Sequence, residues 1–270
     1  MLRSMKDLED YSIGATDGNI GQVTDFLFDD HAWVIRYLVV DTGSWLSSRK
    51  VLISPISIHD PNWGLRTLPV SITKEQVRNS PDIDTDKPIS RQHEIQYHSY
   101  YGYPYYGGGV GIWGAGMYPY MMDPGYPGYS GFGLDRAERE KDREAFEKVE
   151  RARHRNDDPT LRSCKEVMGY HTHATDGDIG HVQDLLVDDA TWAVRYLVVN
   201  TSNWGLGRLV LIAPQWIKDI EWSNGSLTVD LTCASVKDSP PYDPTAELDR
   251  EQESSLHNYY RRPGYWGPTT

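Results

Sequence analysis

Acidic side chains and an arginine recur at fixed spacing in two stretches of the chain, and they are the residues best suited to chemistry. In the first stretch, Asp25 and the pair Asp29-Asp30 precede Arg36. Paired carboxylates can serve general acid–base catalysis or bind a divalent cation. However, aspartates in a hairpin connection commonly bond nearby backbone N–H groups, and a cross-strand pair between Asp25 and Arg36 would satisfy both charges. We therefore expect a structural role for these residues and for their counterparts in the second stretch, Asp184, Asp188-Asp189 and Arg195.

The other candidates for chemistry are weaker. His171 and His173 stand two residues apart, but no cysteine or further histidine lies at a spacing typical of a zinc site. Cys164 and Cys233 form no Cys-x-x-Cys motif, and the serines lack the Gly-x-Ser-x-Gly elbow of a hydrolase. No glycine-rich phosphate loop precedes a helix. The sequence predicts a protein without enzymatic activity, metal or cofactor.

An aromatic residue and an arginine stand close together at one place in each stretch. Trp45 is followed by Arg49, and Trp204 is followed by Arg208. Tryptophan and arginine dominate the energetics of protein interfaces, so these four residues are our candidates for binding a partner protein. In the alternative interpretation, which stays open at this point, the indole simply covers the end of a β core.

The two stretches belong to a long internal repeat. Shifting the chain by 159 positions aligns residues 14–58 with residues 173–217, with 25 identities in 45 positions and no insertion. The match continues into the aromatic tails, so residues 1–111 and 160–270 are two copies of one unit. A length of 270 residues also suits two ordinary domains.

Each copy has the pattern of a small β domain. Asp17-Gly18 and Asp176-Gly177 are two-residue hairpin signals flanked by apolar residues. Short β-branched and aromatic runs follow, and a short helix beginning at Thr73 is predicted after the last of them. This pattern predicts an all-β fold with two small antiparallel barrels in tandem. In the first copy the expected strands cover residues 20–28, 34–40, 50–54, 57–59 and 65–70.

The composition changes twice between the copies. From Ser99 to Gly133, 24 of 35 residues are Gly, Tyr or Pro, which predicts a flexible segment without a core. From Leu134 to Arg155, 15 of 22 residues are charged, which predicts a solvated helix. The expected organisation is a β domain at 1–90, a flexible segment at 91–133, a charged helical linker at 134–159, a second β domain at 160–245 and a flexible tail at 246–270.

One motif order resembles a known family. The hairpin Gly-x-Ile-Gly-x-Val contains Gly18 and Gly21 in the first copy and Gly177 and Gly180 in the second. An Arg-Tyr-Leu-Val-Val strand and a Val-Leu-Ile-x-Pro strand follow it in both copies. This order resembles the PRC-barrel domain, which the H subunit of the purple-bacterial photosynthetic reaction centre shares with a ribosome-maturation factor. The Trp45–Arg49 loop and the aromatic tail resemble those of free-standing bacterial members.

The resemblance implies a β-barrel fold and a habit of docking to other proteins. We therefore expect a non-enzymatic adaptor or scaffold whose two modules bind another protein, or pack on each other as an intramolecular pseudo-dimer or homo-oligomer. A role in ribosome maturation or RNA processing, and a role like that of the reaction-centre H subunit, are the alternatives. A net charge of -12 argues against direct binding to nucleic acid. The first residues lack an apolar signal region and no stretch suits a membrane span, so a cytoplasmic location is expected.

Overall fold

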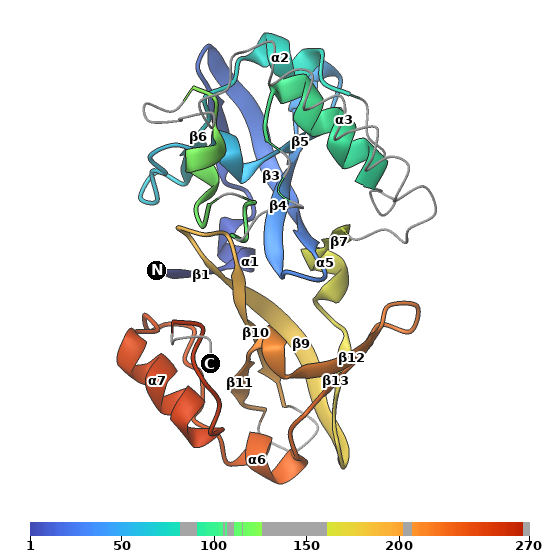
Figure 1. Cartoon of the computed structure of the whole chain (residues 1–270), viewed down its shortest axis with the longest axis vertical. Coiled ribbons are helices and arrows are strands. Elements are labelled where there is room, and N and C mark those ends of the chain that lie inside the picture. The colour runs from blue at the N-terminus through green and yellow to red at the C-terminus, as the bar shows by residue number, and fades with distance from the viewer. Residues whose placement is uncertain are drawn as a thin grey trace. The chain divides into compact units, whose positions relative to one another are not determined.

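The first repeat contributes most of a six-stranded sheet. The structure is a computed structural model that describes residues 1–81, 91–104, 106, 111–114, 116–125, 161–201 and 207–266. The two longest strands of this sheet, β3 and β4, form a twisted antiparallel pair in the upper part of Figure 1. The strand order is β5-β4-β3-β2-β6, and β7 pairs with β3. The bounds are β2 Ser12–Ala15, β3 Gly18–Asp29, β4 Val34–Asp41, β5 Lys50–Ile53, β6 Thr67–Pro69 and β7 Leu161–Ser163.

The second repeat contributes most of a seven-stranded sheet with the same plan. The order is β11-β10-β9-β8-β13-β12, and β1 pairs with β9. In both sheets one pair is parallel, β2 with β6 and β8 with β13. Two sheets and few helices confirm the predicted β class. The bounds are β1 Leu2–Ser4, β8 His171–Ala174, β9 Gly177–Asp188, β10 Val194–Asn200, β11 Leu209–Ile212, β12 Ile217–Glu221 and β13 Ser226–Val229.

The predicted hairpin forms, with its turn one residue earlier than expected. Ala15 pairs with Gly18, so the loop residues are Thr16 and Asp17, and Gly18 already opens β3. The Asp17 carboxylate accepts a hydrogen bond from the backbone N–H of Lys74 at 2.8 Å. In the second repeat, Ala174 pairs with Gly177, and the Asp176 carboxylate accepts from Cys233 N–H at 2.7 Å.

A glycine is required where β3 passes β4 at close range. A Cβ added to Gly21 would lie 2.0 Å from the carbonyl oxygen of Asp41, which no side chain can tolerate. A Cβ added to Gly180 would likewise lie 1.9 Å from the carbonyl oxygen of Asn200. The repeated Gly-x-Ile-Gly motif thus permits a close backbone approach in both sheets.

The short helix predicted after the last strand of the first repeat is α2, Lys74–Arg78. Thr73 is its N-cap and forms a capping box with Gln76. Its counterpart α6, Cys233–Lys237, is capped by Thr232 in the same way. Among the described helices, none has the length and apolar content to cross a bilayer. The other short elements are α1 Met5–Leu8, α5 Cys164–Val167, η1 Gly43–Leu46, η2 Pro55–Ser57, η3 Pro119–Met122 and η5 Pro214–Trp216.

The buried core centres on β4 in the six-stranded sheet and on β10 in the seven-stranded sheet. Every residue of β4 except its last is buried, including Tyr37 and the arginine at position 36. β10 shows the same pattern, except that Arg195 is only partly covered. A strand buried on both faces needs cover from outside the sheet.

Helices supply that cover in the two segments for which flexibility was predicted. In the 91–133 segment, residues Arg91–Tyr101 form α3, and Tyr97 of this helix donates a hydrogen bond to the Leu52 carbonyl of β5 at 2.9 Å. In the 246–270 tail, residues Arg250–Tyr259 form α7, and its Leu256 is buried. The described part of each segment thus packs on its sheet, because a low aliphatic content does not preclude burial when aromatic rings do the packing. The predicted charged helix at 134–159 lies outside the described residues.

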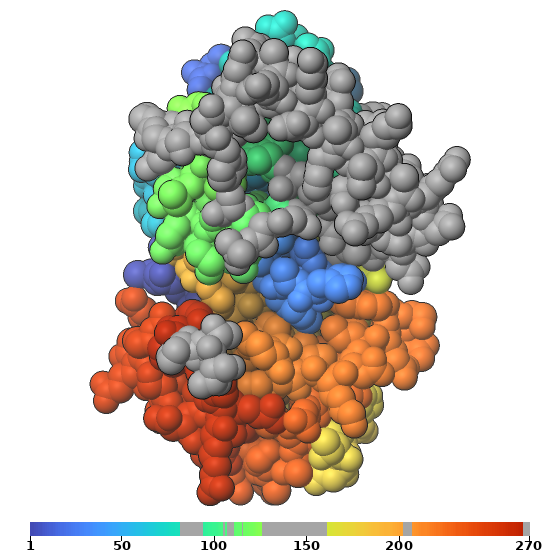
Figure 2. Space-filling model, in the orientation of Figure 1, coloured from blue at the N-terminus to red at the C-terminus, as the bar shows by residue number. Residues whose placement is uncertain are grey.

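Beyond α3, the chain returns to the surface of the same sheet. Residues 116–125 (green in Figure 2) form part of the molecular surface. Their helix η3 packs beside the buried η2. The Asp123 carboxylate fixes this segment, because it accepts from Ser71 Oγ at 2.6 Å and lies 2.8 Å from His59 Nε2.

The two compact units do not coincide with the two sequence repeats. The repeat-one unit consists of Leu8–Ser163 with Ala190–Trp192. The repeat-two unit consists of Met1–Asp7, Cys164–Asp189 and Ala193–Thr270. The predicted boundaries at 90 and 160 did not include an exchange of strands between the repeats. Each unit contains one strand that comes from the other repeat. That strand is β7 in the repeat-one unit and β1 in the repeat-two unit.

Candidate functional site

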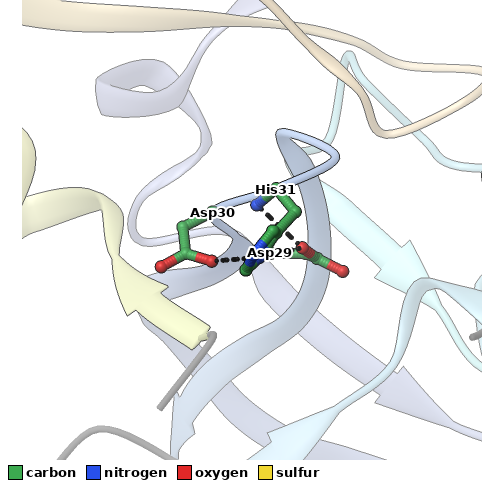
Figure 3. A group of neighbouring side chains, drawn as sticks. All are labelled: Asp29, Asp30 and His31. Carbon is green, nitrogen blue, oxygen red and sulfur yellow. Dashed lines mark hydrogen bonds and ion pairs between the residues drawn. The ribbon is translucent and has the colours of Figure 1, made fainter. Parts of the chain in front are cut away.

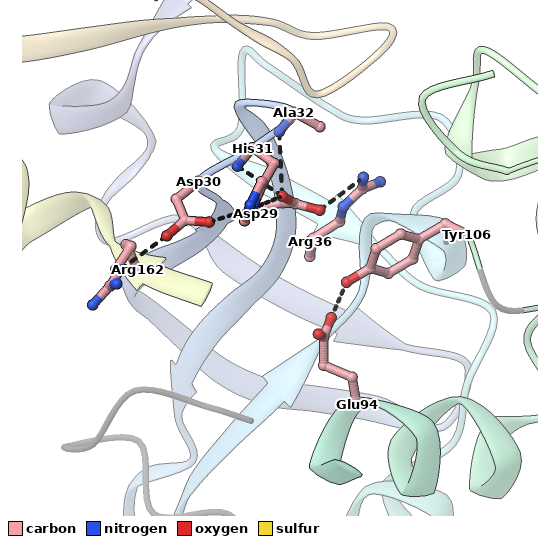
Figure 4. A network of polar contacts seen from close by, with 8 residues as sticks. All are labelled: Asp29, Asp30, His31, Ala32, Arg36, Glu94, Tyr106 and Arg162. Carbon is pink, nitrogen blue, oxygen red and sulfur yellow. Dashed lines mark hydrogen bonds and ion pairs between the residues drawn. The ribbon is translucent and has the colours of Figure 1, made fainter. Parts of the chain in front are cut away.

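The carboxylate and arginine singled out in the first repeat meet in the interior of the repeat-one unit. Arg36 is only 3% exposed, and its Nη2 lies 3.4 Å from Oδ2 of Asp29. The other oxygen of Asp29 accepts from the backbone N–H groups of His31 and Ala32, at 3.0 and 3.2 Å (Figure 4). The aspartate therefore closes the β3–β4 turn and neutralises the arginine at the same time.

The expected cross-strand pair between Arg36 and Asp25 is replaced by this Asp29 pair. The β3–β4 register shifts between Val23 and Asp25 and again between Leu27 and Phe28. Each such bulge changes which side chains share a face of the sheet. The Asp25 carboxylate instead accepts from Ser163 Oγ at 2.6 Å and from its neighbouring backbone N–H at 2.7 Å.

Three consecutive residues at this turn could in principle hold a cation. Asp29, Asp30 and His31 each offer one ligand atom, and these atoms lie within 4.8 Å of one another (Figure 3). However, both carboxylates already face arginines, since Asp30 lies 3.2 Å from Arg162. His31 lies 2.8 Å from Asp30 and is largely exposed. Two guanidinium groups beside the cluster oppose a divalent cation, so the arrangement favours internal ion pairing.

Aromatic residues from the segment beyond β6 enclose the Arg36 guanidinium. Its carbon lies 3.7 Å from the ring centre of Tyr106 and 4.8 Å from that of Trp113. Nη1 donates to the Ile112 carbonyl at 2.6 Å. The Tyr106 hydroxyl donates to the buried carboxylate of Glu94 (Figure 4). Burial lowers the pKa of Arg36, whereas Asp29 and Glu94 oppose that shift and favour the charged form.

A histidine deep in the aromatic cluster is held neutral. Burial lowers the pKa of His98 to about 3. Its Nδ1 lies 3.1 Å from the Pro104 carbonyl, which indicates an N–H donor at this nitrogen. Tyr37 and Tyr106 contact its ring edge to face, with centroid distances of 6.2 and 5.4 Å. Burial also raises the pKa of the neighbouring Tyr97 well above its usual value. These groups stay uncharged at neutral pH and serve packing.

The repeat-two unit contains a copy of this network. Arg195 lies 3.2 Å from Asp188, and its guanidinium carbon is 4.0 Å from the ring centre of Tyr265. The Tyr265 hydroxyl donates to Glu253 at 2.9 Å. His257 lies 3.0 Å from the Tyr196 hydroxyl, and burial lowers its pKa. Each of these residues stands 159 positions after its counterpart, so the Asp–Arg–Tyr–Glu set is duplicated as a unit.

The remaining duplicated aspartates hold the exchanged strands. Asp184 accepts from Ser4 Oγ at 2.5 Å, as Asp25 does from Ser163. Asp189 pairs with Arg3 at 2.9 Å, as Asp30 does with Arg162. Burial raises the pKa of Asp184, and the bonds from Ser4 and two backbone N–H groups partly offset that effect. Every carboxylate considered for acid–base chemistry thus has a bonding partner within its own unit.

The two arginines predicted to bind a partner protein instead contact backbone carbonyls within their own units. Arg49 donates to the carbonyls of Arg78, the last residue of α2, and of Ser80 and Pro81 beyond it, at 2.9–3.1 Å. Arg208 donates to the carbonyls of Lys237, the last residue of α6, and of Ser239, at 2.7 and 2.6 Å. These bonds favour a role in fixing the helix ends.

The indole of Trp45 is half-buried. Its Nε1 donates to the carbonyl of Ile20, and the ammonium of Lys74 lies 4.4 Å from the ring centre. Trp204 lies outside the described residues. His173, considered above for a metal site, lies 2.6 Å from the carboxylate of Asp178.

Sequence reasoning missed the aromatic lining and its acidic partners. Glu94, His98 and Tyr106 match Glu253, His257 and Tyr265 across the repeat, so the repeat itself carried a usable signal. Trp113 lies outside the aligned copies and carried none.

Comparison with known proteins supports the family resemblance for the first repeat. The PRC-barrel domain family matches residues 4–77. No curated protein matches the chain at a significant level.

Proposed function

We propose that the protein is a non-enzymatic adaptor that binds another protein, built from two PRC-barrel modules. The family match covers the first repeat, and the alignment at a shift of 159 residues supports extending it to the second. The engagement of the duplicated aspartates and arginines in internal pairs supports a role without catalysis.

The observation that carries the proposal is an exposed apolar segment held in a defined shape. Met117, Tyr118 and Met121 expose 48%, 39% and 44% of their surface. Methionine and tyrosine side chains adapt well to a partner surface and contribute strongly to interfaces. The segment is fixed by Asp123, so little ordering would be needed on binding.

Affinity capture with the full chain tests this proposal. Three baits are compared: the wild type, the double variant Met117→Ser/Met121→Ser, and the control variant Leu65→Ser. Leu65 is an isolated leucine, 75% exposed, on the same unit. We expect mass spectrometry to identify proteins retained by the wild type and the control but lost from the double variant.

Two results would count against the proposal. If all three baits retain the same proteins, the segment is not the docking surface. If no bait retains a specific protein from cells that express the chain, the adaptor function itself is wrong. Circular dichroism of each bait shows whether the substitutions leave the fold intact.

A further inference from the structure

The strand exchange defines a binding site for a particular short sequence. The donor strands β1 and β7 have the same sequence, Leu-Arg-Ser. They pair in the same antiparallel register, with Ser4 opposite Leu186 and Ser163 opposite Leu27. The acceptor edges are the C-terminal ends of β3 and β9, beyond the residues that pair with β2 and β8. Each edge therefore binds the same three residues through backbone pairing.

Side chains add selectivity at each of the three donor positions. The arginine of each donor faces an aspartate in the acceptor turn, with Arg3–Asp189 at 2.9 Å and Arg162–Asp30 at 3.2 Å. The serine of each donor donates to an aspartate within the acceptor strand, at 2.5 and 2.6 Å. The leucine of β7 is 1% exposed. An acceptor edge therefore selects an apolar residue, a cation and a small hydroxyl in sequence.

The contacts do not depend on which chain supplies the donor. Each donor already sits on the acceptor of the other repeat, and the two acceptors use equivalent aspartates at equivalent distances. A donor from another molecule of the same sequence would make identical contacts. We propose that β3 and β9 are strand-acceptor sites that bind the Leu-Arg-Ser strand of a second copy of this chain, giving a strand-exchanged dimer. Covalent linkage gives the donor of the same chain an effective concentration on the order of millimolar, so the dimer forms at high protein concentration.

A charge-swap experiment on the full chain tests the proposal. One variant carries Arg162→Glu and the other carries Asp30→Arg, so each alone places like charges at the acceptor of the repeat-one unit. When the two are mixed, each acceptor finds an opposite charge only on the other chain. We expect a dimer by analytical ultracentrifugation in the mixture, and monomers in each separate solution. The matched control carries both substitutions in one chain, which restores the pair within the chain, and should stay monomeric.

Refolding of the wild type gives a second measurement that needs no substitution. The chain is unfolded in urea and refolded at low and at high protein concentration. We expect the dimer fraction to rise with the concentration during refolding. The proposal is overturned if the charge-swap mixture stays monomeric while both variants are folded. It is equally overturned if the wild type refolds only to monomer at every concentration.

Discussion

Arg36 and Arg195 occupy equivalent positions in the two repeats, and their surroundings differ. Arg36 is enclosed by Tyr106 and Trp113 and donates to the Ile112 carbonyl, so almost none of it reaches solvent. The side chain of Arg195 keeps 15% of its surface exposed. Its ring partner Tyr265 also faces a second cation, Arg250, at 4.9 Å.

Some of the contacts around these arginines are common to both units, and others occur only in the repeat-one unit. The aspartate, glutamate and tyrosine, which both repeats share, place the covering segment against β4 or β10. The residues from 112 onward add full enclosure in the repeat-one unit alone. Because a buried charge depends on its partners far more than an exposed one, equivalent substitutions should have unequal effects.

The largest expected difference concerns the arginines themselves. Arg36→Ala leaves the carboxylates of Asp29 and Glu94 buried without their cation, and we expect it to lower the free energy of unfolding by ~3–5 kcal/mol. Arg195→Ala should cost ~1 kcal/mol, because water reaches Asp188. Urea denaturation followed by far-ultraviolet circular dichroism measures both. Equal losses would contradict the contrast between the two surroundings.

The next effect is on pH dependence. The unfolded chain binds a proton at His98 near its ordinary pKa of 6.5, whereas the folded chain does so only near about 3. Stability from this residue is therefore complete above pH 6.5 and is lost as the pH falls toward 3, with a slope of ~1.4 kcal/mol per pH unit. Urea denaturation at several pH values gives the free energy of unfolding as a function of pH. Its slope against pH should be shallower for His98→Gln than for the wild type. His257→Gln, in the less enclosed unit, should change the slope less.

A smaller difference is expected for the tyrosine hydroxyls. Tyr106→Phe removes a donor from the buried Glu94 carboxylate and should cost ~2 kcal/mol. Glu253 retains an ion pair with Arg250 at 3.0 Å, so Tyr265→Phe should cost ~1 kcal/mol or less. Thermal unfolding by calorimetry compares the two variants. A larger loss for Tyr265→Phe would show that the Arg250 pair does not compensate.

The smallest difference should appear where the units are most alike. Arg49→Ala and Arg208→Ala each remove bonds to the carbonyls after a short helix, and we expect ~1 kcal/mol for both. A fall in melting temperature with unchanged capture of partner proteins would support the structural role. An unchanged melting temperature with lost capture would support the docking role first considered for these residues.

Local features of the fold could be predicted from the sequence. The hairpin follows from Asp17 and the glycines beside it, and α2 follows from the cap at Thr73. These elements depend on residues a few positions apart, whose preferences act locally. The repeat also indicated that Arg36 and its aspartates form one structural group, although the register shifts in β3 changed the partner from Asp25 to Asp29.

Long-range features could not be predicted in the same way. A strand of three residues such as Leu2–Ser4 has too few positions to show a hydrophobic period, and its partner lies more than 180 residues away. The burial of Tyr97 and Trp113 depends on surfaces that exist only once the sheet has formed. The amino-acid composition of these segments shows that they are poor in aliphatic residues. It does not show which surface an aromatic ring will pack against.

The exchange of β1 and β7 also bears on how the polypeptide responds to proteolysis. A protease cut between residues 126 and 160 would divide the chain into two fragments, each with most of one repeat. Each unit would still contain a piece of both fragments, since Met1–Asp7 belongs with repeat two and Leu161–Ser163 with repeat one. The fragments should therefore co-purify under native conditions and separate only in denaturant. Both units would stay folded although the polypeptide chain is cut.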